Sequence, residues 1–233
     1  MTVMPSRRER IRTATVAEIQ DLARGLLVAG GPSAISLRAI ARDMGMTAPA
    51  IYRYFPSLDA LVRYLVEALY DELRLVVEAV RDPAAPPAAQ LLEMARAFRR
   101  WSVSHPAEFG LMFGTPVPGV RTFEEDCVDE SHAGARFGAP FIAALTQLWE
   151  EAPFPAPPAD LLIERFGPHL APYTAEQGAK VPVQVIYVYL SAWTRLYGMV
   201  ALEVFGHLTW SLTSLEPLFE TELELFIDQM TRG

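Results

Sequence analysis

Residues 47–54 bring hydroxyl, guanidinium and aromatic groups together in a pattern that suits contact with a phosphate polymer. Thr47 and Tyr52 carry hydroxyl groups that can donate to phosphate oxygens. Arg53 carries a planar guanidinium that can pair with the edge of a guanine base. We therefore expect Thr47 and Tyr52 mainly on phosphates and Arg53 at base edges. The candidate contact residues, with one from the preceding segment, are Arg38, Thr47, Ala48, Ala50, Tyr52, Arg53 and Tyr54.

The residues around this segment predict two short helices joined by a tight turn. Ser36 suits the N-cap of the first helix, because its hydroxyl can accept from an unpaired backbone N–H. Gly45 can adopt the positive φ with which a chain often leaves a helix, and Thr47 can cap the next helix. The whole pattern is a helix-turn-helix, whose second helix typically enters the DNA major groove. The expected inward-facing residues are Leu37, Ile40, Ala41, Met44, Ile51 and Phe55.

This stretch resembles the DNA-binding signature of the TetR family of transcriptional regulators, in which a Gly-x-Thr/Ser turn leads into a helix ending Tyr-x-Tyr/His-Phe. The chain has Gly45-Met46-Thr47 and Tyr52-Arg53-Tyr54-Phe55, and the likeness extends over residues 10–70. Where the family commonly has a lysine that touches a phosphate, this chain has Leu58. Arg53 or Arg63 are the candidates to replace that contact.

A second resemblance lies in the C-terminal half. Residues 193–198, Trp-Thr-Arg-Leu-Tyr-Gly, resemble the Trp-x-x-x-His-Gly motif of one TetR subgroup, with Tyr197 in place of the histidine, and residues 106–114 match the same subgroup. The resemblance implies an all-α protein. It consists of an N-terminal three-helix helix-turn-helix DNA-binding domain over residues 1–64 and a helical effector-binding and dimerisation domain over residues 65–233.

The distribution of charge along the chain agrees with this division into two domains. Residues 1–64 hold nine arginines and five acidic residues, a net charge of +4, whereas the remaining residues carry −12, giving −8 in total. A basic surface neutralises phosphates locally, and an acidic remainder would repel DNA and help orient the molecule.

The single cysteine, Cys127, allows no internal disulfide framework, and residues 1–16 lack the apolar core of a signal peptide. We expect a cytoplasmic protein.

Apolar periodicity predicts helices throughout and shows no strand pattern of useful length. The N-terminal arm with Arg7, Arg8, Arg10 and Arg12 is either a disordered solvated tail or a phosphate and minor-groove contact. Residues 120–136 are acidic and read as a loop, and residues 152–159 as a proline-rich connector. The predicted helices cover residues 13–29, 58–81, 88–105, 106–113, 137–151, 163–166, 181–206 and 215–231.

The helix predicted over residues 181–206 is apolar on nearly every side. Its length would allow a membrane span, but Gln184, Arg195 and Glu203 and the DNA-binding head argue against one. A helix that is apolar all round is buried all round. We therefore expect no membrane contact and a homodimer through residues 181–206 and 215–231, the two helices that usually pair as a four-helix bundle in TetR-like proteins.

Large side chains in the second half suit an apolar ligand pocket with a few polar tips, although such aromatic stripes are more often plain core. The sequence predicts a small, mostly apolar effector, neutral or cationic unless an anion pairs with Arg99, Arg100 or Arg195. The candidate ligand-binding residues are Trp101, His105, Phe109, Phe113, Tyr187, Trp193 and Tyr197.

Motifs for catalysis, cofactors or metals are absent from the sequence. His105, His132, His169, His207 and Cys127 have no ligand spacing, and acidic residues 124–130 suit a solvated loop. We therefore expect no enzyme, no cofactor and no metal. The leading hypothesis is a ligand-responsive regulator, a repressor that binds a palindromic operator in double-stranded DNA as a homodimer. The alternatives are a DNA-binding protein without effector response and a helical enzyme with an incidental helix-turn-helix.

Overall fold

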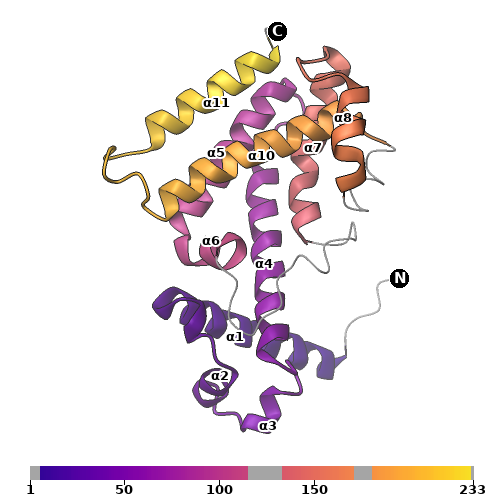
Figure 1. The fold of residues 1–233 in the computed structure, drawn as a ribbon. Helices are drawn as coiled ribbons and strands as arrows, with labels where there is room; N and C mark the ends of the chain where they lie inside the picture. The colour runs from indigo at the N-terminus through magenta and orange to yellow at the C-terminus, as the bar shows by residue number, and fades with distance from the viewer. Residues whose placement is uncertain (1–5, 115–132, 171–179, 232–233) are drawn as a thin grey trace. The chain divides into compact units, whose positions relative to one another are not determined.

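The computed structural model describes residues 6–114, 133–170 and 180–231, and every regular element within these ranges is helical (Figure 1). The predicted all-α fold is therefore confirmed. The elements are α1 (Arg7–Gly30), η1 (Pro32–Ala34), α2 (Leu37–Asp43), α3 (Ala48–Ile51), α4 (Leu58–Ala79), α5 (Pro87–Ser104), α6 (Pro106–Phe113), α7 (Ala133–Glu151), α8 (Ala159–Phe166), η3 (Gly167–His169), α10 (Val183–Val204) and α11 (Glu216–Thr231).

The described residues form two compact units. The first unit contains residues 6–69 and 107–114, and the second contains residues 70–106, 133–170 and 180–231. Helix α4 begins in the first unit and ends in the second. Residues of this one helix therefore belong to both units.

The core of the first unit is built from inward-facing aliphatic residues of α1 and α2. Ile19, Ala23 and Leu27 of α1 are fully buried, as is Ile40 of α2. Leu27 takes the last inner position of α1, whereas its neighbour Leu26 is half-buried. The predicted inner residues of the helix-turn-helix are buried except Met44, which is half-buried.

An ion pair ties α6 to α1 within the first unit. The Arg24 Nε atom donates to Glu108 Oε1 at 2.9 Å, and the Glu108 side chain is 5% exposed. A buried carboxylate is costly unless it is paired, so this contact fixes α6 against α1.

Helix α1 begins earlier than its apolar pattern predicts. Ser6 and Glu9 form a capping box: the Ser6 hydroxyl accepts from the Glu9 N–H, and the Glu9 carboxylate accepts from the Ser6 N–H. Hydrogen bonding of the Glu9 carboxylate to the Ser6 side chain, and then to the Ser6 N–H, lowers the pKa of the Glu9 carboxyl. Arg7, Arg8, Arg10 and Arg12 are thus exposed residues of the first turns of a helix, and the disordered tail considered from the sequence is wrong.

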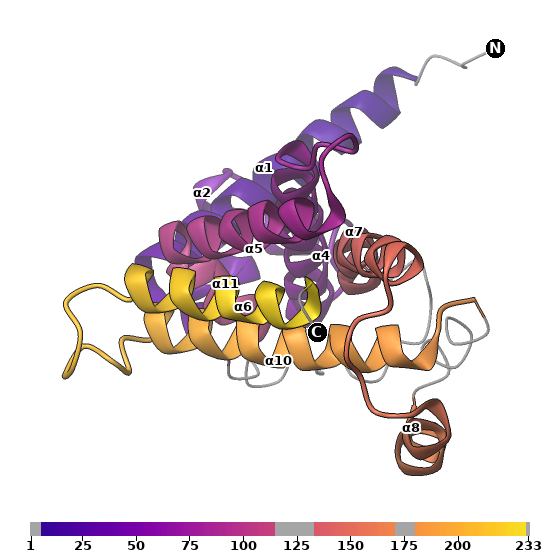
Figure 2. The same cartoon turned by 90° about the horizontal axis from the view of Figure 1, so that it is seen from above.

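The second unit is a bundle in which α5 contacts α7, α10 and α11, and α10 also contacts α7 and α8. Figure 2 shows α11 running alongside α10 after the chain turns back. Rings of Phe98, Phe137 and Trp193 meet at its centre, with centroids 5.5–5.9 Å apart. Helices α7 and α10 approach so closely that a Cβ atom on Gly138 would collide with the Tyr189 hydroxyl.

Two arginines of α5 join this helix to the C-terminal pair. Arg99 makes a bidentate contact with Glu203 of α10, both distances being 2.7 Å, and Arg96 contacts Glu220 of α11 at 2.7 Å. Hydrogen bonding to these carboxylates raises the pKa of each guanidinium above its already high ordinary value. Both arginines therefore have their positive charge neutralised inside the bundle.

Most helix boundaries agree with the sequence prediction to within a few residues. Helix α7 begins four residues earlier than expected, at Ala133, and α8 begins at Ala159, directly after Pro158. Proline at this N-cap position costs no helical hydrogen bond, so the connector ends at residue 158. Residues 115–132, with Cys127, His132 and the acidic residues 124–130, lie outside the described residues, as do residues 171–179.

Candidate nucleic-acid interface and ligand pocket

The turn between α2 and α3 has the geometry that its residues predict. The Ser36 hydroxyl accepts from the Ala39 N–H at 3.4 Å, which caps α2. Gly45 has a φ of +64°, and the Met46 N–H donates to the Ala41 carbonyl at 2.8 Å. This is the closing hydrogen bond of a Schellman-type helix end, which needs a left-handed residue just before it. The turn therefore sets the direction in which α3 leaves.

Helix α3 is shorter than predicted. It ends at Ile51, and Tyr52, Arg53 and Tyr54 lie in a tightened turn in which the Tyr54 N–H donates to the Ile51 carbonyl at 2.9 Å. Thr47 occupies the N-cap position, but its side chain caps no backbone N–H of α3. The predicted capping role of the Thr47 hydroxyl is wrong, and this exposed hydroxyl is not used by the helix.

Most of the predicted DNA-facing side chains are accessible in the first unit. Tyr52 is 45% exposed, Ala50 and Tyr54 are half-buried, and the four remaining residues are exposed: Arg38, Thr47, Ala48 and Arg53. Inward packing of Ile51 and Phe55, both buried, forces the intervening side chains outward. Five of the seven predicted contact residues are thus exposed in the single chain.

Two further arginines border this surface. The Arg12 guanidinium lies over the Tyr54 ring, 5.5 Å from its centroid, so α1 contributes a cation next to the turn after α3. Arg63, a candidate for the missing lysine contact, donates through Nε to Asp59 at 3.1 Å. Arg63 is therefore engaged by a carboxylate, whereas Arg53 is exposed.

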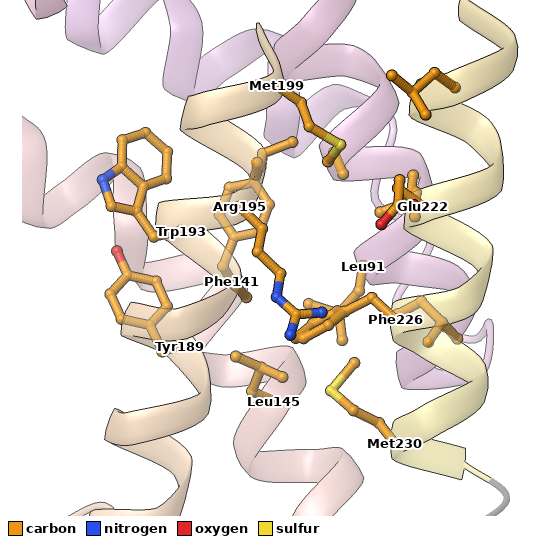
Figure 3. A pocket seen from close by; sticks show the side chains of 16 residues that line it. Leu91, Phe141, Leu145, Tyr189, Trp193, Arg195, Met199, Glu222, Phe226 and Met230 are labelled. Atoms are coloured by element: carbon orange, nitrogen blue, oxygen red, sulfur yellow. The ribbon is translucent and has the colours of Figure 1, made fainter. Parts of the chain in front are cut away.

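The second unit contains an apolar pocket of about 420 Å³ (Figure 3). Arg195 and Glu222 are the two charged residues among its lining, and Figure 3 places them on different walls, from α10 and α11 respectively. Its size lies within the range of about 300–1,000 Å³ that is usual for ligand sites. The lining residues are Leu91, Ala95, Phe141, Leu145, Tyr189, Ala192, Trp193, Arg195, Leu196, Met199, Leu218, Glu222, Leu223, Phe226, Ile227 and Met230.

Of the ligand-binding residues predicted from the sequence, Trp193 lines this pocket. Tyr197 stacks on Trp193 with ring centroids 6.0 Å apart but does not line it, and Tyr187 lines two other hollows of the second unit. The sequence could not separate these residues, because all three lie on one apolar helix with buried and open faces.

The other predicted ligand-binding residues make contacts outside this pocket. Trp101 donates its indole N–H to Glu72 at 2.9 Å, and His105 stacks on Trp101 and contacts its carbonyl oxygen through Nδ1 at 2.8 Å. Phe109 and Phe113 pair with each other in the first unit. Residues of α11 such as Phe226 were missed, because their role depends on a fold that returns α11 to α5.

The outer face of α10 is open in the single chain. By length and composition α10 could cross a membrane, and only 28% of its most apolar window is buried. Leu190 and Leu202 on α10, Phe205 directly after it, and Leu218 and Leu225 on α11 are exposed. Within the described ranges, no group of three or more His, Cys, Asp or Glu side chains is arranged to hold a metal ion.

Comparisons with known proteins match both parts of the chain. Residues 19–65 match the profile of bacterial regulatory proteins of the tetR family, and residues 91–226 match the tetracyclin repressor-like C-terminal domain. The HTH-type transcriptional regulators Mb1846 of Mycobacterium bovis and Rv1816 of Mycobacterium tuberculosis are each 38% identical over 120 residues, which is 51% of this chain and 51% of theirs. The chain thus spans about half the length of these relatives.

Solved structures share the fold over nearly the whole chain. The crystal structure of SCO4313, whose regulatory role is itself inferred, has a TM-score of 0.74 and 31% identity and covers 96% of this chain and 98% of its own. A protein of unknown function from Rhodococcus sp. RHA1 has a TM-score of 0.65, 18% identity and coverage of 92% and 94%, which concerns the fold alone.

The fold and the exposed helix-turn-helix define a protein of the regulator class rather than an enzyme, which is also the class of the matched relatives. The chain belongs to the tetR family of bacterial regulatory proteins.

Proposed function

We propose that this protein is a cytoplasmic transcriptional repressor that binds a palindromic operator as a homodimer and is released from it by a small, mostly apolar effector. The observation that carries the proposal is the apolar pocket of about 420 Å³ in the second unit of a chain whose first unit is a helix-turn-helix. A DNA-binding protein without an effector would gain nothing from leaving such apolar surface unfilled, since packing it would add stability.

Operator contact is assigned to the accessible end of the helix-turn-helix. Arg53 and Arg38 supply cations, and Thr47 and Tyr52 supply hydroxyl groups, all four being exposed. A two-fold dimer through α10 and α11 would present two such surfaces about 34–36 Å apart, one turn of DNA. The exposed leucines on these two helices support that dimer, because they would be covered in it.

Helix α4 is the proposed link between the pocket and the DNA surface. Its second half is held by Trp101 of α5 through Glu72, and by Arg136 of α7 through Asp71 at 3.1 Å. Helices α5 and α7 also supply pocket residues. A ligand that prefers a changed spacing of α5 and α7 would shift α4, and DNA affinity would fall by the difference in its affinity for the two states.

A nuclease footprint on the DNA upstream of the protein's own gene tests the proposal. The expected result is protection of two inverted half-sites whose centres are about 10 base pairs, or a multiple of one turn, apart. Protection should disappear when a pocket ligand is added. Protection without sequence preference that ignores every tested ligand would instead support an architectural DNA-binding protein.

A further inference from the structure

The apolar pocket is lined by a cation, Arg195, that has no carboxylate partner among the described residues. Arg195 of α10 is exposed and lies over the Phe226 ring, 5.1 Å from its centroid. By contrast, Arg96 and Arg99 of the same unit are each held by glutamates. An aromatic ring orients a guanidinium without neutralising its charge, so Arg195 can still bind an anion.

A second, more open hollow adjoins the pocket at this position. Arg195, Phe226 and Met230 line both, and the second hollow also has the polar residues Ser191, Asp228 and Gln229. Arg195 is therefore shared by an apolar space and a more polar one. Figure 3 shows Arg195 extending from α10 across the pocket toward Phe226.

We propose that the effector is an amphiphile with one carboxylate, whose apolar chain fills the pocket while Arg195 binds its head. The inference rests on the proposed effector response and deepens it. The Ser191 hydroxyl and the Gln229 amide can donate hydrogen bonds to the same head. Of the ligands considered from the sequence, this assignment selects the anion paired with Arg195 over the neutral or cationic one.

The charges around the head favour a single negative charge. Glu222 and Asp228 line the two spaces that meet at Arg195, and both would repel a phosphate with two charges more strongly than a carboxylate. A bidentate guanidinium–carboxylate contact matches Arg195, the one cationic side chain among the described residues that line these two spaces. An alcohol of the same chain length would fill the pocket equally well but would gain no such contact.

Titration calorimetry of the full chain with dodecanoate and dodecanol, both below their micellar concentrations, tests the proposal. The wild type should bind dodecanoate about tenfold or more tightly than dodecanol, the difference expected of one charge-assisted contact. Arg195→Gln should bind both probes with equal affinity and leave the affinity for dodecanol within about twofold of wild type. Arg100→Gln, a change at an exposed arginine of α5 that lines neither space, should keep the preference.

Three outcomes would overturn the inference. Equal affinity of the wild type for both probes would refute the carboxylate head and leave the apolar effector standing. Failure of both probes to bind would count against both this inference and the proposed pocket. A preference for dodecanoate that survives Arg195→Gln would place the head elsewhere. Light scattering of the variant separates a changed head contact from a changed oligomeric state.

Discussion

At the scale of single residues, Arg53 and Tyr54 are neighbours in the chain with different surroundings. Arg53 is exposed, whereas Tyr54 is half-buried beneath the Arg12 guanidinium. A guanidinium that is free to turn can form two parallel hydrogen bonds with guanine, which gives sequence discrimination. A half-buried tyrosine under a cation is better suited to hold α1 beside the turn. We therefore assign base reading to Arg53 rather than to Tyr54.

Replacing Arg53 by alanine tests this assignment. We expect the preference for the operator over a sequence changed at one guanine to fall by about 1–3 kcal/mol, because one bidentate base contact is lost. Fluorescence anisotropy with the two DNA duplexes measures it. Arg165→Ala, at an exposed arginine of α8, is the matched control and should change neither affinity. Unchanged operator affinity and sequence preference in Arg53→Ala would sink the assignment.

At the scale of elements, local sequence signals predicted the helices well, and long-range contacts remained hidden. Ser36, Gly45 and the aliphatic spacing of α2 act within a few residues, so their consequences can be read from the sequence. Ser6 and Glu9 have the spacing of a capping box, but the arginines around them suggested an N-terminal arm rather than the start of α1. Such capping residues, rather than the apolar periodicity, determine where each of these helices begins or ends.

The pocket could not be predicted residue by residue, for a physical reason. Whether an aromatic residue fills the core or lines a pocket depends on partners far away in the chain. Trp101 donates a hydrogen bond to Glu72, which is 29 residues away in the chain, and Arg99 pairs with Glu203, which is 104 residues away. Without those pairings, Trp101 and Trp193 look alike in the sequence, yet only Trp193 lines the pocket.

The contact between α1 and α6 carries a prediction about stability. Arg24→Met leaves the buried Glu108 carboxylate without this cation and should lower the free energy of unfolding by about 3 kcal/mol. Glu108→Gln leaves a partly exposed arginine that water can reach, so the loss should be about 1 kcal/mol. Urea denaturation at neutral pH measures both. Equal losses in the two variants would show that burial of the carboxylate does not dominate this contact.

At the scale of the whole molecule, α10 and α11 expose apolar side chains that a second protein chain could cover. Stable interfaces bury about 1,200–2,000 Å² in total, and two exposed apolar helices per chain can supply such an area. A two-fold arrangement would bring the same faces together from both chains.

We predict that the double variant Leu202→Glu/Leu225→Glu is monomeric at micromolar concentration, because it would bring four charges into the apolar interface of the dimer. Light scattering coupled to gel filtration measures the mass. Leu75→Glu, at an exposed leucine of α4, should remain a dimer. A wild-type protein that is monomeric under these conditions while it still binds its operator would contradict the proposed interface.

Release of operator DNA by a ligand bound in the pocket is the most direct test of the account. Anisotropy of a labelled operator duplex is followed while dodecanoate is added to the complex with wild type and with Ala192→Phe, which places a ring in the pocket. The wild type should release the duplex at the ligand concentration that half-fills its pocket. The variant should bind the duplex normally and keep it, because its pocket is already filled. A wild-type complex that stays intact when calorimetry shows the pocket saturated, or a variant released at the same concentration as wild type, would contradict the central claim.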